Sequence, residues 1–225
     1  MSRRLSSWRR RAALLGLRHE AVKIHGQQRA GTNFVGSLVK ANAPKALLPW
    51  PDEGGWKHGP FEPHRRWKYL VVARHPLAWI ESLHDWEVKH GRSTAPSLSA
   101  FLREPTVDPR LAQVWGADQP WDVYTAAYSA WLDSSLITAL VRYDDLVREP
   151  GRATDRLFAE LDLPRPALAL DVLERADVWQ TQIERRPLDR RRSLDGWQDV
   201  VEPGDVDFVR SRIPTSLLER LGYSI

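Results

Sequence analysis

The stretch Val22-Lys-Ile-His-Gly-Gln-Gln-Arg-Ala-Gly-Thr-Asn-Phe34 indicates how the chain is organised. Apolar and polar residues alternate over 21–25, which predicts a β-strand. Gly26 and Gly31 then bracket a tight loop, and apolar residues at helical spacing follow over 33–40. A strand, a glycine-bracketed loop and a helix together present backbone N–H groups and a positive helix end to a phosphate. The stretch therefore predicts a phosphate-binding loop.

The loop departs from the generic nucleoside triphosphate pattern G-x-x-x-x-G-K-[ST]. Thr32 occupies the lysine position, Asn33 occupies the position of the metal-binding hydroxyl, and the cation lies inside the loop as Arg29. This combination suits an anionic ligand that is bound without Mg²⁺, and we expect no metal site. Because short glycine motifs often match by chance, an ordinary strand-to-helix turn stays open on this stretch alone.

Length and composition indicate a single globular domain. The chain has 225 residues, of which 42% are hydrophobic and 28% are charged. We expect a basic lead-in over 1–20 and one domain over 21–225. The chain has no cysteine, which excludes disulfides and a cysteine nucleophile and is compatible with a cytoplasmic location.

The charge balance suits small anionic ligands as well as nucleic acid, since the formal net charge is +4. No stretch approaches the roughly 20 apolar residues that span a bilayer. The arginine-rich lead-in leaves open a peripheral contact with an acidic membrane surface, although a solvated tail is the simpler interpretation. Oligomeric state cannot be read from the sequence.

The rest of the chain alternates strands with helices. The apolar run 67–74 predicts a strand buried on both faces, and 137–143 predicts another strand. Helices are predicted after each of them, a further helix is predicted over 167–178, and a last helix is predicted over 206–221. This alternation predicts an α/β fold with a central parallel sheet flanked by helices.

Four segments, in order, resemble the sulfotransferases that use 3′-phosphoadenosine-5′-phosphosulfate (PAPS). The segment 28–34 is similar to that family's 5′-phosphosulfate loop, and 74–82 is similar to its 3′-phosphate motif, in which a serine follows a strand-ending arginine by eight residues. Arg142-Tyr-Asp-Asp-Leu146 resembles the family's Y-E-D-L segment. Arg191-Arg-Ser-Leu-Asp-Gly-Trp197 resembles its R-x-G-x-x-G-x-W region.

The resemblance implies a three-layer P-loop-like fold and PAPS as the donor co-substrate, with adenosine 3′,5′-bisphosphate as the product. It also implies that Arg74 and Ser82 bind the 3′-phosphate and that Tyr143 lies near the adenine. The full set of donor-binding residues implied by the resemblance is Gln28, Arg29, Ala30, Gly31, Thr32, Asn33, Arg74, Ser82, Tyr143, Arg191 and Arg192.

In-line sulfuryl transfer requires fixed positive charge on the leaving phosphate and a base for the acceptor hydroxyl. Arg29 fits the first role. His58 is our choice for the base, because the segment Lys57-His58 resembles the family's Lys/His segment and histidine titrates near neutral pH. His64 and His84 are the alternatives.

The sequence leaves the acceptor open. We expect its pocket to be shaped by 43–63 and 91–121, and a carbohydrate, a glycolipid or a small molecule carries the required hydroxyl. Two other functions stay open: a P-loop kinase or NTPase, and a non-catalytic basic module that binds nucleic acid. The first requires the lysine and the hydroxyl that Thr32 and Asn33 replace, and the second requires one continuous basic stripe.

Overall fold

A computed structural model describes residues 21–43, 46, 48–49, 52–53, 55–104, 108–164 and 194–225. The predicted lead-in 1–20, the helix predicted over 167–178, and Arg191 and Arg192 lie outside the described residues. The domain boundary at residue 20 therefore stays a prediction.

The centre of the described chain is a parallel sheet with the strand order β1-β2-β3. The strands are β1 Ala21–His25, β2 Trp67–Ala73 and β3 Ile137–Arg142. Ala21 is paired with Trp67, and Ala73 is paired with Arg142. Both predicted pairs of strand and following helix, and the parallel α/β architecture, are confirmed.

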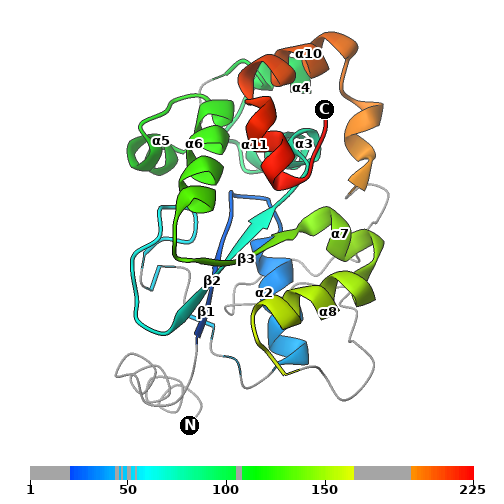
Figure 1. Cartoon of the computed structure of the whole chain (residues 1–225). Coiled ribbons are helices and arrows are strands. Elements are labelled where there is room, and N and C mark those ends of the chain that lie inside the picture. The colour runs from blue at the N-terminus through cyan, green and yellow to red at the C-terminus, as the bar shows by residue number, and fades with distance from the viewer. Residues whose placement is uncertain are drawn as a thin grey trace.

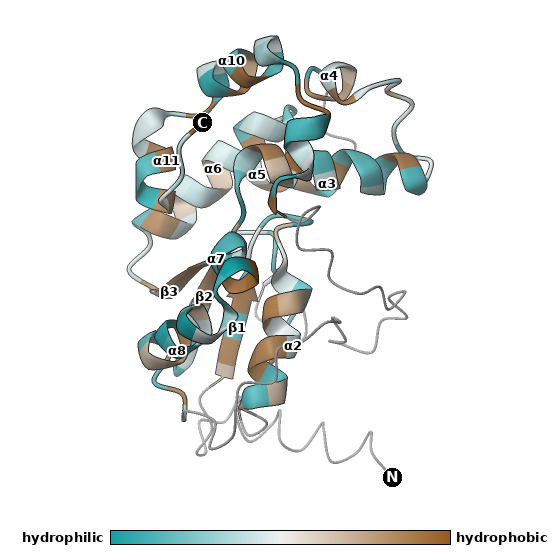
Figure 2. Cartoon of the chain, turned by 90° about the vertical axis from the view of Figure 1, so that its right-hand side faces the viewer, coloured by the Kyte–Doolittle hydropathy of each residue, from teal (hydrophilic) through white to brown (hydrophobic). Residues whose placement is uncertain are grey.

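Helices cover both faces of this sheet, as Figures 1 and 2 show. One face packs against α2 Thr32–Asn42, α7 Tyr143–Arg148 and α8 Pro150–Glu160. The other face packs against α3 Pro76–Lys89, α4 Leu98–Phe101, α6 Pro120–Asp133, α10 Pro203–Arg212 and α11 Thr215–Leu221. The remaining elements are α5 Pro109–Trp115 and the short 3₁₀ helix η1 Gly196–Asp199.

The middle strand shows why the layers form. Successive side chains of a strand point to opposite faces, so Leu70 and Val72 join the cluster with α2 while Val71 and Ala73 join the cluster with α3. All four side chains are fully buried, as predicted for a strand covered on both sides. The strands accordingly appear brown, the hydrophobic colour, in Figure 2.

The prediction of one last helix over 206–221 is wrong. The structure has two helices, α10 and α11, and the break falls at Ile213-Pro214. Pro214 has no N–H to donate within a helix, and a residue that precedes proline is disfavoured in the helical conformation. Ile213 accordingly has an extended conformation, with φ −109° and ψ 123°.

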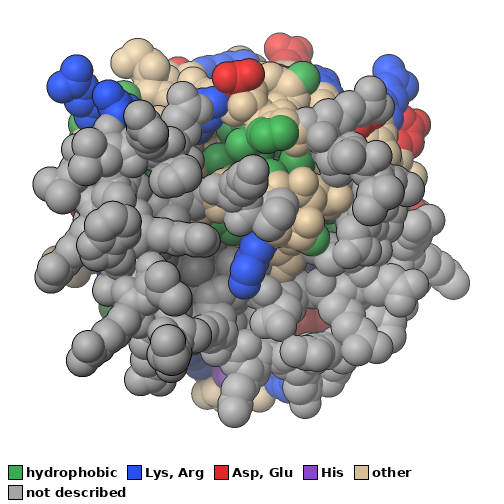
Figure 3. All heavy atoms as spheres, turned by 90° about the horizontal axis from the view of Figure 1, so that it is seen from below, with side chains coloured by type: hydrophobic (Ala, Val, Ile, Leu, Met, Phe, Trp, Pro, Cys, Tyr) green, Lys and Arg blue, Asp and Glu red, His purple; other side chains and the backbone are tan. Residues whose placement is uncertain are grey.

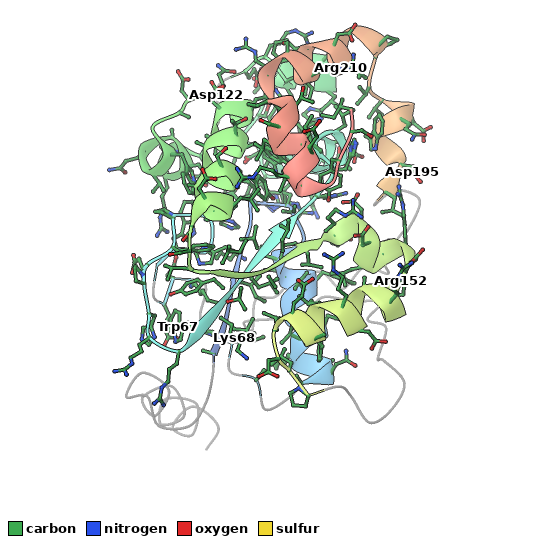
Figure 4. All side chains as sticks on the ribbon, in the orientation of Figure 1. Trp67, Lys68, Asp122, Arg152, Asp195 and Arg210 are labelled. Carbon is green, nitrogen blue, oxygen red and sulfur yellow. The ribbon has the colours of Figure 1, made fainter. Side chains whose placement is uncertain are left out.

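The strand ends place the functional segments. Because the strands are parallel, the loop after β1, Arg74 after β2 and Tyr143 after β3 all follow carboxyl ends at the same edge of the sheet. Trp67 and Lys68 mark the opposite, amino-terminal end of β2 in Figure 4. No described helix is long and apolar enough to cross a bilayer.

Candidate functional site

The loop between β1 and α2 depends on its two glycines. A Cβ on Gly26 would lie 2.7 Å from the carbonyl oxygen of Val72, and a Cβ on Gly31 would lie 2.4 Å from Cδ2 of Tyr143. Gly31 also has φ +97°, in the left-handed region that favours glycine. It is the N-cap residue of α2, and among the described residues no side chain caps the start of this helix. The loop therefore brings the start of α2 close to the end of β3 and leaves backbone N–H groups for an anion.

Arg29 and Arg74 meet beside this loop. Nη1 of Arg74 donates to the carbonyl oxygen of Arg29 (3.2 Å), and Nε of Arg29 lies 3.4 Å from Oγ of Ser82. The Arg74 guanidinium carbon lies 5.2 Å from the centre of the Tyr143 ring. The structure thus brings together four residues predicted to bind the donor, one from the loop, two from the segment 74–82 and one from the segment 142–146.

The charges in this cluster favour an anionic ligand. Arg74 is buried, whereas Arg29 is exposed as a whole residue and can reach a ligand from the surface. Partial burial of the Arg29 guanidinium and the positive charge of Arg74 lower the pKa of Arg29, while the charge of Asp85 acts in the opposite direction. Two neighbouring guanidiniums destabilise one another, and a bound phosphate would relieve this repulsion.

The segment Lys57-His58 binds the first glycine of the loop from both sides. The N–H of Gly26 donates to the carbonyl oxygen of Lys57 (3.1 Å), and Nδ1 of His58 donates to the carbonyl oxygen of Gly26 (2.5 Å). The tautomer of neutral His58 therefore has its proton on Nδ1 and its lone pair on Nε2. The predicted base thus lies next to the predicted phosphate loop.

Lys57 itself reaches the helix that follows the loop. Its Nζ donates to Oδ1 of Asn33 (2.9 Å) in the first turn of α2. Sequence reasoning did not assign a role to Lys57, although the residue lies in the quoted Lys57-His58 segment. A cation at this position supplies, from another part of the chain, a positive charge near the place where the generic pattern has its lysine.

Burial sets the protonation of both residues. Burial, together with the charge of Lys57, lowers the pKa of His58 to about 3, so this ring is neutral at pH 7. Burial lowers the pKa of Lys57 to about 8. A bound anion beside them would raise both pKa values, because an opposite charge favours the protonated form.

Two further predicted loop residues, Gln28 and Ala30, have partners within the protein. Nε2 of Gln28 donates to Oδ2 of Asp108 (2.5 Å), and the carbonyl oxygen of Gln28 accepts from Nε1 of Trp79 (2.7 Å). The N–H of Ala30 donates to the carbonyl oxygen of Gln27 (3.1 Å). Thr32 is buried at the start of α2.

The two segments predicted to shape an acceptor pocket come together near His58. Nε1 of Trp115, the last residue of α5, donates to the carbonyl oxygen of His58 (2.8 Å). The guanidinium carbon of Arg110 lies 4.1 Å from the centre of the Trp56 ring. These contacts place α5 beside the predicted base, where it can limit which acceptor approaches.

The alternative histidines lie elsewhere. His64 stacks on Trp67 near the amino-terminal end of β2 (4.1 Å between ring centres), away from Arg74. His84 packs against Phe101 (5.0 Å between ring centres). Among the described residues no group of three or more His, Cys, Asp or Glu side chains could hold a metal ion.

Comparisons with known proteins are limited to solved structures, because no protein-family model and no curated protein matches the chain. The sulfotransferase domain from the Synechococcus PCC 7002 olefin synthase aligns with 16% identity and a TM-score of 0.42 over 86% of this chain and 65% of that domain. The sulfotransferase domain from the curacin biosynthetic pathway aligns with 18% identity and a TM-score of 0.41 over 86% of this chain and 69% of that domain. The chain thus spans slightly less than two thirds of the first of these domains.

Proposed function

We propose that this protein is a sulfotransferase that moves a sulfuryl group from PAPS to an acceptor hydroxyl. The observation that carries this proposal is the meeting of Arg29 and Arg74 at the carboxyl ends of β1 and β2. The Arg74 side chain donates a 3.2 Å hydrogen bond to the backbone carbonyl oxygen of Arg29. Burial lowers the pKa of Arg29, and the two guanidiniums are near enough that the charge of Arg74 lowers this pKa further. Two such cations, beside the start of α2, fit a nucleotide with anionic groups at both ends of its ribose.

Each end of the donor has its own residues in this proposal. Arg74 and Ser82 bind the 3′-phosphate, and Arg29 with the loop N–H groups binds the 5′-phosphosulfate. The aromatic ring of Tyr143 lies beside both the loop and Arg74, so it can contact the adenosine. Arg191 and Arg192 are assigned to the 3′-phosphate from the resemblance alone.

The chain's residues would divide the reaction as follows. Nε2 of His58 accepts the proton of the acceptor hydroxyl, whose oxygen forms a bond to sulfur as the bond from sulfur to the phosphate oxygen breaks. Arg29 and Lys57 stabilise the negative charge that the leaving phosphate gains. A pKa of about 3 makes His58 a weak base. The proposal therefore requires that the bound anion raises this pKa.

The two rival functions require features that the described site lacks. A P-loop NTPase needs a metal-binding hydroxyl, whereas Oδ1 of Asn33 at that position accepts a hydrogen bond from Lys57. A nucleic-acid-binding module needs one basic stripe. Described arginines instead form ion pairs with acidic side chains, as Arg110 does with Asp52 and Arg220 with Asp133. The Lys and Arg side chains that are coloured in Figure 3 form no continuous stripe among the described residues.

The test is an incubation with radiolabelled PAPS and a panel of carbohydrate, glycolipid and small-molecule hydroxyl acceptors. We expect labelled product from the wild-type protein and a loss of about 10²- to 10³-fold in rate for Arg29→Ala, since a charge-stabilising donor contributes about that much. His58→Ala should also be strongly impaired. Mg²⁺-dependent hydrolysis of a nucleoside triphosphate, with no sulfuryl transfer to any acceptor, would overturn the proposal.

A further inference from the structure

The peptide unit that joins Arg74 to His75 is held at both of its polar atoms by buried side chains. The hydroxyl of Tyr124, on α6, donates to the carbonyl oxygen of Arg74 (3.1 Å). Oδ2 of Asp144, on α7, accepts from the N–H of His75 (3.0 Å). Because these bonds fix the plane of the peptide, they also fix the direction in which the Arg74 side chain leaves the backbone.

Asp144 is in turn held by the carboxy-terminal segment, residues 222–225, which follows α11. The hydroxyl of Tyr223 donates to Oδ2 of Asp144 (2.6 Å), so one carboxylate oxygen accepts from both the His75 N–H and Tyr223. Asp144 is buried, and burial and the carboxylate raise the pKa of Tyr223 well above its usual value. Tyr223 therefore stays a hydrogen-bond donor at any working pH. Burial likewise raises the pKa of Tyr124.

Further contacts tie η1 and the carboxy-terminal segment to the turn after β2 and to the end of β3. The ring of His75 stacks on Trp197 (5.1 Å between ring centres, 13° between planes), and its Nε2 lies 3.2 Å from the carbonyl oxygen of Ser224. Arg142, at the end of β3, donates to the carbonyl oxygen of Gly222 and pairs with Asp145. The segment thus bridges the carboxyl ends of β2 and β3.

We infer that Asp144 and Tyr223 are positioning residues that aim Arg74 at the 3′-phosphate and so determine the preference for a 3′-phosphorylated nucleotide. This inference rests on the proposed function, in which Arg74 binds that phosphate. Neither residue contacts the ligand in this arrangement. Their effect passes from the Tyr223 hydroxyl to the Asp144 carboxylate, to the His75 N–H, and to the peptide unit that carries Arg74.

The test compares two ligands that differ only at the 3′ position. Calorimetry gives the dissociation constants of adenosine 5′-phosphate and adenosine 3′,5′-bisphosphate, and their ratio measures what the 3′-phosphate contributes. We expect Tyr223→Phe and Asp144→Asn to lower this ratio by about tenfold, the effect of one misplaced charged hydrogen bond. A loss of folding alone would weaken both ligands equally and leave the ratio unchanged.

Tyr128→Phe is the matched control. The Tyr128 hydroxyl is also buried and donates to a backbone carbonyl of β2, that of Val72 (2.9 Å), which carries no predicted ligand contact. This variant should keep the wild-type ratio. An unchanged ratio in folded Tyr223→Phe and Asp144→Asn would overturn the inference alone. A wild-type protein that does not prefer the 3′-phosphorylated ligand would overturn the proposed function, and the inference with it.

Discussion

Replacing Gly31 by alanine should destabilise the protein through two separable costs. The first is the backbone, because Gly31 has φ +97° and a left-handed conformation costs about 1–2 kcal/mol for a residue with a Cβ. The second is overlap, because the new Cβ would lie 2.4 Å from Cδ2 of Tyr143 and 3.0 Å from two further ring carbons. Overpacking of this kind costs about 1–3 kcal/mol. The two together lower the free energy of unfolding by about 2–5 kcal/mol.

Gly91 offers a control that isolates the first cost. It has φ +66°, and a Cβ there would meet nothing within 4 Å, so Gly91→Ala should cost only the backbone term. Tyr143→Ala removes the ring, so the costs of Gly31→Ala and Tyr143→Ala should not add when the two are combined. Urea unfolding, followed by tryptophan fluorescence, measures all four variants. The reasoning is refuted if Gly31→Ala costs no more than Gly91→Ala, or if the double variant is additive.

Three further predictions concern the segment next to the loop. Burial lowers the pKa values of His25 and His58 to about 3, so in this range the unfolded chain binds more protons than the folded protein. The free energy of unfolding is therefore highest above about pH 6.5 and falls as the pH approaches 3, by up to about 5 kcal/mol per histidine. Urea unfolding measured at a series of pH values tests this, and an unchanged slope of unfolding free energy against pH in His58→Asn would contradict it. Lys57→Met removes a cation with a lowered pKa of about 8 from Asn33. It should slow sulfuryl transfer by about 10²-fold, because the leaving phosphate loses a stabilising charge. The melting temperature should not fall, because the variant no longer has to bury a charged group. Full transfer activity would count against the role assigned to Lys57. Trp115→Phe loses the 2.8 Å bond to the carbonyl oxygen of His58 and should cost about 1 kcal/mol. It should raise KM for the acceptor more than KM for the donor, which steady-state kinetics with each substrate varied in turn would measure. A larger rise in KM for the donor would contradict the prediction.

Local patterns predicted the parts of the site that are close in sequence. The strand, the loop and the start of α2 follow from the alternation over 21–25 and from Gly26 and Gly31. The strand ending before Arg74 was equally clear, since its seven residues are apolar apart from Lys68. Because parallel strands end at one edge of a sheet, the meeting of Arg29 with Arg74 could also be anticipated.

Contacts between distant segments could not be predicted in this way. Lys57 reaches Asn33 across 24 positions of sequence, and Tyr223 reaches Asp144 across 79. These contacts depend on the course of irregular segments across the edge of the sheet, and a periodic sequence pattern does not predict that course. The break at Pro214 was readable from the residue type, whereas α5 gave only a short pattern bounded by Pro109 and Gly116.

The central claim is that Arg29 and Arg74 bind one nucleotide together, and calorimetric titration of adenosine 3′,5′-bisphosphate tests it most directly. We predict one binding site per wild-type chain and a dissociation constant raised by about 10- to 100-fold in both Arg29→Ala and Arg74→Ala, as expected for the loss of a charged hydrogen-bonding group. Wild-type protein that does not bind the bisphosphate, or full affinity in either variant, would contradict the claim.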